Sequence, residues 1–187
     1  MDNKQTSRTA VSTKNGLPPE TRKKVAELLN QLLATTVDLY SHAKQAHWNV
    51  RGHHFMTLHK LFDKVAEQVS EHGDEIAERA GQLGFGVSGT IRQAAKTTSL
   101  NDYSLQIASG EEHVERLSTS ISEYTKLLLH GIEITDEADD PITTDLLTTI
   151  CRACDQMLWF VESHNTLGTE QSNMLGSNKK QASAAVA

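Results

Sequence analysis

The segment that decides the fold is KQAHWNVRGHHFMTLHKLFDKVAEQVSEHGDEIAERAGQLG, residues 44–84. Gly52 separates two stretches of helical periodicity, one ending near residue 50 and the other covering about residues 56–83. Five side chains of kinds that bind metals occur along the segment, namely His47, His59, Asp63, Asp74 and Glu78. Their spacing along the predicted helices determines whether one chain can bring them around one metal ion.

The helix predicted for residues 56–83 turns its candidate ligands away from its own core. At ~100° per residue its apolar stripe lies near ~45°, whereas the four ligands spread over roughly 140° to 240°. His59 with Asp63, and Asp74 with Glu78, are i, i+4 pairs that each present two side chains together. The midpoints of the pairs are about 22 Å apart at ~1.5 Å per residue, so one helix cannot close both pairs around one ion.

Small residues interleave these ligands on the same side of the helix. They are Ala66, Ser70, Gly73, Ala77 and Gly81. A side lined with small residues permits close approach of a second helix. If two copies cross antiparallel about a two-fold axis near residues 68–70, each pair of one chain meets the other pair of its partner, which gives two shared metal sites per dimer. The alternative for each acid is a solvated charged helix face.

Whole-chain properties favour one all-helical domain. The 187 residues and 20.6 kDa suit a single core, and 5% aromatic residues with three prolines favour helices over strands. A net charge of −6 argues against a protein coated in basic surface for nucleic acid. No apolar run reaches the ~20 residues that cross a bilayer and no secretory signal is present, so we expect a cytoplasmic protein.

Composition and periodicity divide the chain into three parts. We expect disordered tails at residues 1–17 and 165–187 and a helical domain over residues 18–164. Helices are predicted over residues 20–50, 56–83 and 90–97, from Gly110 onward, and from Pro141 onward.

Helix-capping residues and a cysteine pair mark the second half of the domain. Ser109 and Asp140 are the predicted N-caps of the last two helices, with Pro141 at the first helical position. Cys151 and Cys154 form a C-x-x-C that allows a redox pair or half a zinc site, but its place inside a helical pattern favours small buried side chains.

Several motifs together resemble the Dps family, the DNA-binding proteins from starved cells, also called mini-ferritins. They are QAHWNVRG at 45–52, the H-x-x-x-D of His59 and Asp63, the D-x-x-x-E of Asp74 and Glu78 leading into AERAGQLG, and LWFVES at 158–163. The resemblance covers about residues 20–163. It implies a ferritin-like four-helix bundle with a short extra helix in the long connection between the second and third main helices, assembled into a hollow dodecamer.

The same resemblance implies an iron-oxidising centre at each two-fold interface. The matching positions are His47, His59 and Asp63 from one subunit with Asp74 and Glu78 from the two-fold partner. Mixed imidazole and carboxylate ligands suit Fe(II) and its Fe(III) product, while Zn²⁺ competes for the same set. Trp48 resembles the tryptophan associated in this family with trapping oxidising equivalents, with interface packing as its alternative role.

The resemblance also implies what the assembled protein does. The expected function is a ferroxidase and iron store that oxidises Fe(II), preferably with hydrogen peroxide and otherwise with dioxygen, and deposits ferric mineral, protecting against oxidative damage. The alternative is a DNA-compacting nucleoid protein whose metal site is vestigial or holds zinc.

Two further sets of residues are candidates by resemblance. Asp140 and Asp145 are candidates for an acidic iron-access pore at a three-fold axis, with capping and solvent exposure as their respective alternatives. Tail residues that can attract DNA are Lys4, Arg8, Lys14, Lys179 and Lys180.

Overall fold

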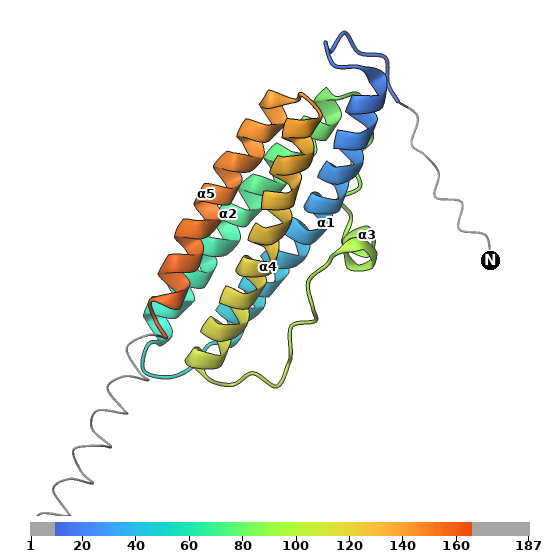
Figure 1. Ribbon diagram of the computed structural model, residues 1–187. Helices are drawn as coiled ribbons and strands as arrows, with labels where there is room; N and C mark the ends of the chain where they lie inside the picture. The colour runs from blue at the N-terminus through green and yellow to red at the C-terminus, as the bar shows by residue number, and fades with distance from the viewer. Residues whose placement is uncertain (1–9, 166–187) are drawn as a thin grey trace, which may run out of the picture.

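The computed structural model describes residues 10–165, and this part of the chain contains five helices and no strand. Four long helices lie alongside one another, and the short α3 sits beside α1 on a long connection (Figure 1). The helices are α1 (Pro19–Asn49), α2 (Phe55–Gln82), α3 (Ile91–Thr97), α4 (Gly110–Glu137) and α5 (Pro141–Glu162). The predicted all-helical bundle and its short extra helix are confirmed.

One long crossover determines the topology. α1 and α2 are joined by a short turn at Gly52, whose φ of +105° suits a residue without a Cβ. The chain then returns along the full length of the bundle before α4 begins, so that α2 and α4 run in the same direction (Figure 1). α1 packs chiefly on α2, and α4 on α5. This connectivity is one of the known four-helix arrangements.

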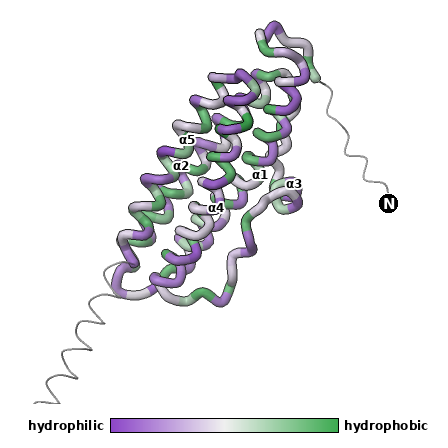
Figure 2. Tube along the Cα trace, in the orientation of Figure 1, coloured by the Kyte–Doolittle hydropathy of each residue, from purple (hydrophilic) through white to green (hydrophobic). Residues whose placement is uncertain are grey.

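Each long helix alternates apolar and polar residues along its length (Figure 2). Its apolar positions meet in one core, which includes Leu29, Phe62, Ile76, Leu117 and Ile150, all 0% exposed. Cys151 and Cys154 are free thiols buried in this core, in agreement with the packing role favoured from sequence. None of the helices in residues 10–165 is long and apolar enough to span a membrane.

Local capping fixes where the last two helices begin. The Ser109 hydroxyl accepts a hydrogen bond from the Glu112 amide at 3.1 Å, and the Glu112 carboxylate accepts one from the Ser109 amide at 2.9 Å. This capping box satisfies amide groups that have no partner inside α4. Asp140 caps α5 by accepting from the Thr143 amide at 3.1 Å, with Pro141 next in the chain. Both predicted caps are confirmed.

Residues 10–17 correct the predicted N-terminal tail. The Val11 amide donates to the carbonyl of Gly84 at 2.8 Å. Arg22 donates to the carbonyls of Leu17 and Leu83, at 3.2 and 2.9 Å, and so ties this segment to the end of α2. The expected disorder over residues 1–17 is therefore wrong for its last eight residues. The first nine lie outside the described residues. The polar composition of this segment predicts disorder. Its order comes from backbone hydrogen bonds, which cannot be predicted from the pattern of side chains.

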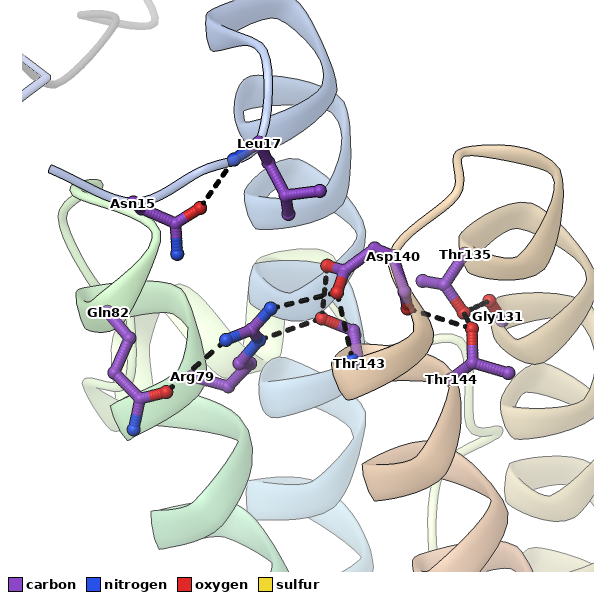
Figure 3. Close-up of polar contacts among 9 residues, drawn as sticks. All are labelled: Asn15, Leu17, Arg79, Gln82, Gly131, Thr135, Asp140, Thr143 and Thr144. Carbon is purple, nitrogen blue, oxygen red and sulfur yellow. Dashed lines mark hydrogen bonds and ion pairs between the residues drawn. The ribbon is translucent and has the colours of Figure 1, made fainter. Parts of the chain in front are cut away.

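A buried ion pair joins the end of α2 to the start of α5 (Figure 3). The Arg79 guanidinium lies 2.8 Å from the Asp140 carboxylate and also donates to the Thr143 hydroxyl at 2.8 Å. The side chains are 9% and 1% exposed. Asp140 thus has two roles. It caps α5, and it neutralises the buried positive charge of Arg79.

Removing the Asp140 carboxylate is expected to destabilise the protein strongly. Asp140→Ala leaves the buried Arg79 charge unpaired and removes a helix cap, and we expect a loss of about 3–5 kcal/mol in unfolding free energy. Urea unfolding at fixed protein concentration measures it. Asp145→Ala, at an exposed position on the same helix, is the matched control, with an expected change within about 0.5 kcal/mol. Equal losses in the two variants would contradict the assigned role of the ion pair.

Candidate functional site

The first part of the candidate metal centre lies near the turn between α1 and α2, where two histidines stack and hydrogen-bond to each other's backbone. The rings of His47 and His59 stack with centroids 3.8 Å apart and planes 19° apart. His47 Nδ1 lies 2.7 Å from the His59 carbonyl oxygen, and His59 Nδ1 lies 2.9 Å from the His47 carbonyl oxygen. A carbonyl only accepts, so both Nδ1 atoms carry the proton and both Nε2 atoms keep a free lone pair. Phe55 also stacks against His59, with centroids 5.1 Å apart.

Asp63 lies one helical turn beyond His59 and joins the histidine pair. Its carboxylate is 3.8 Å from His47 Nδ1 and accepts a 2.7 Å hydrogen bond from the Lys44 ammonium. The Lys44 hydrogen bond is the largest of the effects that hold the pKa of Asp63 below its ordinary value, and His47 and His59 act in the same direction. The structure therefore places His47 beside both His59 and Asp63, although the three side chains do not form a metal-binding group by themselves. The Asp63 carboxylate is ionised.

Lys44 is a site residue that the sequence analysis missed. It occupies the position three residues before His47, on the same face of α1, and this spacing is the signal that could have found it. The ammonium also lies 5.7 Å from the centroid of the Trp48 ring, within range of a cation–π interaction. Trp48 itself is 61% exposed in the single chain, so its indole is available to a partner surface.

Asp74 and Glu78 lie on α2 far from the histidine pair. Both are exposed, and neither forms a hydrogen bond or ion pair with another described residue. Asp63 and Asp74 are eleven residues apart on one straight helix, or about 16 Å at 1.5 Å per residue. Within residues 10–165 of a single chain, no three His, Cys, Asp or Glu side chains are close enough to hold a metal ion.

A groove along α1 and α2 connects the two halves of the ligand set. It has a volume of about 950 Å³ and contains both Asp63 and Asp74 in its lining. Four of the small residues of α2 are among those that line it, namely Ala66, Ser70, Gly73 and Ala77. Tyr40 also lines it and is 41% exposed in the single chain, although it lies at helical spacing from the buried Leu29 and Leu33 of α1. An apolar or aromatic residue that recurs at helical spacing can be buried either by the core of its own chain or by a second chain.

The predicted pore residues lie at the start of α5 in different surroundings. Asp140 is 1% exposed and bonded to Arg79 and Thr143, as described above. Asp145 is exposed, one turn further along the helix. Of the basic tail residues, Lys14 is described and exposed, whereas Lys4, Arg8, Lys179 and Lys180 lie outside the described residues.

Comparison with known proteins gives a consistent set of relatives. The model of the ferritin-like domain matches residues 26–169. A DNA protection during starvation protein from Agrobacterium fabrum is 39% identical over 152 residues, which cover 81% of this chain and 94% of the relative. One from Brevibacillus brevis is 32% identical and covers 74% of this chain and 93% of the relative.

Solved structures agree with these sequence relatives. The structure of Mycobacterium smegmatis Dps in a tetragonal crystal form superposes with a TM-score of 0.79 at 30% identity, covering 83% of this chain and 94% of that one. DpsC from Streptomyces coelicolor superposes with a TM-score of 0.80 at 30% identity, covering 83% and 91%.

Lys44 is expected to compete with a divalent cation for Asp63. A cation that binds this carboxylate has to displace an ammonium 2.7 Å away. Because the Asp63 side chain is 39% exposed, the ion pair contributes only about 0.2–1 kcal/mol, and Lys44→Met should tighten Co²⁺ binding by roughly 1.4- to 5-fold. Calorimetric titration of the assembled protein measures this, with Lys60→Met on α2 as the control. Weaker Co²⁺ binding by Lys44→Met would mean that the lysine positions Asp63 for the metal.

Proposed function

Because the chain belongs to the Dps family of ferritin-like proteins, we propose that it is a ferroxidase and iron-storage mini-ferritin. It oxidises Fe(II), with hydrogen peroxide as the main oxidant, at sites shared between two subunits. The ferric product collects as mineral inside a hollow dodecameric shell, which protects the cell from oxidative damage. Its place is the cytoplasm, with association to the nucleoid where DNA is bound.

The observation that carries this proposal is the division of the ligands along one groove. The His47–His59 stack with Asp63 lies at one end of α2, and Asp74 with Glu78 lies toward the other. A second copy of α2, crossing antiparallel over the small residues between them, brings each end against the opposite end of its partner. The same contact covers the groove and completes two sites.

The ligand chemistry supports Fe(II) as the substrate. Two imidazole Nε2 atoms with free lone pairs and three carboxylates form a mixed nitrogen and oxygen set, which binds Fe(II) and stabilises Fe(III) better than thiolates do. Their orientation is fixed before metal arrives, because each histidine is held by the carbonyl of the other. A set of five ligands shared between two subunits leaves coordination positions for peroxide or dioxygen. Zn²⁺ fits the same ligands as a redox-inactive competitor.

The proposed activity also needs a route by which Fe(II) enters the shell and a residue that takes up stray oxidising equivalents. Asp145 is the better candidate for an acidic pore, because its carboxylate is exposed, whereas the carboxylate of Asp140 is engaged by Arg79. Three or more such carboxylates around a symmetry axis raise the local concentration of Fe(II). Trp48 is proposed to lie near the shared site, where an oxidisable ring can take up stray oxidising equivalents or pack the interface.

A second candidate function is DNA protection by direct binding. The observation that favours it is the name shared by the relatives from Agrobacterium fabrum and Brevibacillus brevis. The acidic body, with a net charge of −6, opposes it. The five basic residues of the two tails would be displayed twelve times on a dodecamer, and multivalency compensates for weak single contacts.

Mixing two inactive variants tests the shared site directly. His59→Ala/Asp63→Ala and Asp74→Ala/Glu78→Ala should each oxidise Fe(II) at a rate close to the uncatalysed one. Shells reassembled from a 1:1 mixture should recover about a quarter of the wild-type rate, because half of the two-fold interfaces are mixed and each mixed interface contains one intact site of two. Ferric absorbance after peroxide addition measures the rate. Native activity in the Asp74→Ala/Glu78→Ala variant would overturn the assignment.

DNA binding is tested separately from iron oxidation. We expect a gel-mobility shift at low ionic strength that weakens as salt rises, since binding through lysine and arginine releases counterions from DNA. Changing the five basic tail residues to Gln should abolish the shift and leave Fe(II) oxidation unchanged. A shift that survives these substitutions would place the DNA-binding surface on the helical body.

A further inference from the structure

A second group of titratable and aromatic residues lies where the long connection meets the start of α4. The Tyr103 hydroxyl is 2.8 Å from Nδ1 of His113, and the two rings stack with centroids 5.9 Å apart. His113 is 1% exposed. When the phenol donates this hydrogen bond, Nδ1 is the acceptor and the ring proton of His113 is on Nε2. The carbonyl of Asn49 is the polar group that this imidazole faces on α1, although Nε2 makes no hydrogen bond of good geometry.

The surroundings keep this pair in its neutral forms. Burial raises the pKa of the Tyr103 phenol, so it stays protonated near neutral pH. Burial likewise lowers the pKa of His113, against the opposing effect of the neighbouring Glu112, and Arg51 lowers it further. The imidazole can therefore accept a proton. The Arg116 guanidinium lies 5.9 Å from the centroid of the Tyr103 ring and disfavours additional positive charge on it, so loss of an electron has to be accompanied by loss of the proton.

The pair is next to the part of α1 that contains the metal site. The start of α4 packs directly on the turn between α1 and α2, because a Cβ on Gly110 would meet Leu58 at 2.8 Å and the Arg51 carbonyl at 3.5 Å. One turn further along α4, the His113 imidazole faces the backbone of Asn49 without a hydrogen bond of good geometry. Asn49 is bonded to Trp48 and lies two residues from His47. The Tyr103 phenol is therefore hydrogen-bonded to an imidazole that faces the backbone of the segment containing His47.

The other two tyrosines of the chain have no such base. Tyr124 lies 2.7 Å from the Thr36 hydroxyl, which itself donates to the Leu32 carbonyl at 2.8 Å, so Tyr124 donates to a hydroxyl that is too weak a base to take its proton. Tyr40 is 41% exposed and has no hydrogen-bond partner among the described residues. Of the three phenols, Tyr103 is the one hydrogen-bonded to an imidazole.

We propose that Tyr103 is a redox-active residue that supplies one electron to the iron site, with His113 as the acceptor of its phenolic proton. This inference rests on the proposed ferroxidase function. Hydrogen peroxide is a two-electron oxidant, and a site that holds a single Fe(II) supplies only one electron. Tyr103 supplies the second, which prevents release of a hydroxyl radical.

The reaction balances without a further reagent. The O–O bond of hydrogen peroxide breaks as it takes one electron from Fe(II) and one from the phenol. Two protons from solvent complete two water molecules. The phenolic proton moves to His113 Nδ1, leaving Fe(III), a neutral tyrosyl radical and an imidazolium. A later Fe(II) returns the electron to the radical, and the proton moves back from the imidazolium.

Rapid freezing after mixing tests this proposal. Iron-free shells loaded anaerobically with one Fe(II) per site are mixed with peroxide, frozen, and examined by electron paramagnetic resonance, while ferric absorbance is followed in the same mixture. We expect a tyrosyl signal whose hyperfine splitting collapses when the protein contains ring-deuterated tyrosine. Tyr103→Phe should abolish the signal, whereas Tyr40→Phe and Tyr124→Phe should retain it. His113→Phe, which keeps the ring volume but removes the base, should lower its yield.

The outcomes separate this inference from the proposed function. Rapid Fe(II) oxidation without a tyrosyl signal, or a signal that survives Tyr103→Phe, overturns the role of Tyr103 and leaves the ferroxidase intact. Absence of Fe(II) oxidation in the wild-type shell overturns the ferroxidase and the role of Tyr103 with it. Tyr103→Phe removes a single oxygen atom, and size-exclusion chromatography checks that the variant still assembles as the wild type does.

Discussion

The pairing of α1 with α2 is the contact on which the remaining structure and the site depend. The two helices are antiparallel neighbours joined by a turn of a few residues, so the end of one always lies beside the start of the other. This geometry places His47 against His59 and lets each imidazole donate to the backbone carbonyl of the other. The ring orientation is thus determined by the backbone, and the free Nε2 atoms need no further side chain to hold them.

Much of the fold follows from short-range patterns in the sequence. The helix boundaries were predicted to within a few residues because caps such as Ser109 and Asp140, together with apolar periodicity, act over three or four positions. Ligand spacing along α2 is also local, so the separation between the Asp63 and Asp74 ends could be calculated without a structure. These features depend on the helix alone.

Contacts between distant segments could not be predicted in this way. The Lys44–Asp63 and Arg79–Asp140 pairs join different helices, and one lysine or arginine among many gives no sign of which acid it will meet. The tether from Val11 to Gly84 uses backbone atoms only, which explains why a polar composition was mistaken for disorder there. Tyr40 shows a different limit, since apolar periodicity identifies a buried face without stating whether the chain itself or a second copy buries it.

If each metal site is shared between two copies of the chain, as proposed, the stability of the contact between the copies and the activity of the site depend on the same surface. In a single chain the α1–α2 groove is open, Asp74 and Glu78 have no described partners, and Trp48 is largely exposed. Covering this surface with a second copy buries apolar area and brings opposite ends of α2 together in one step. Metal ions bound between the copies would stabilise that contact further, because a ligand that binds only the assembled form shifts the equilibrium toward it. If the site is shared in this way, the small residues that line the groove would affect iron chemistry without touching iron, through the approach distance that their side chains permit.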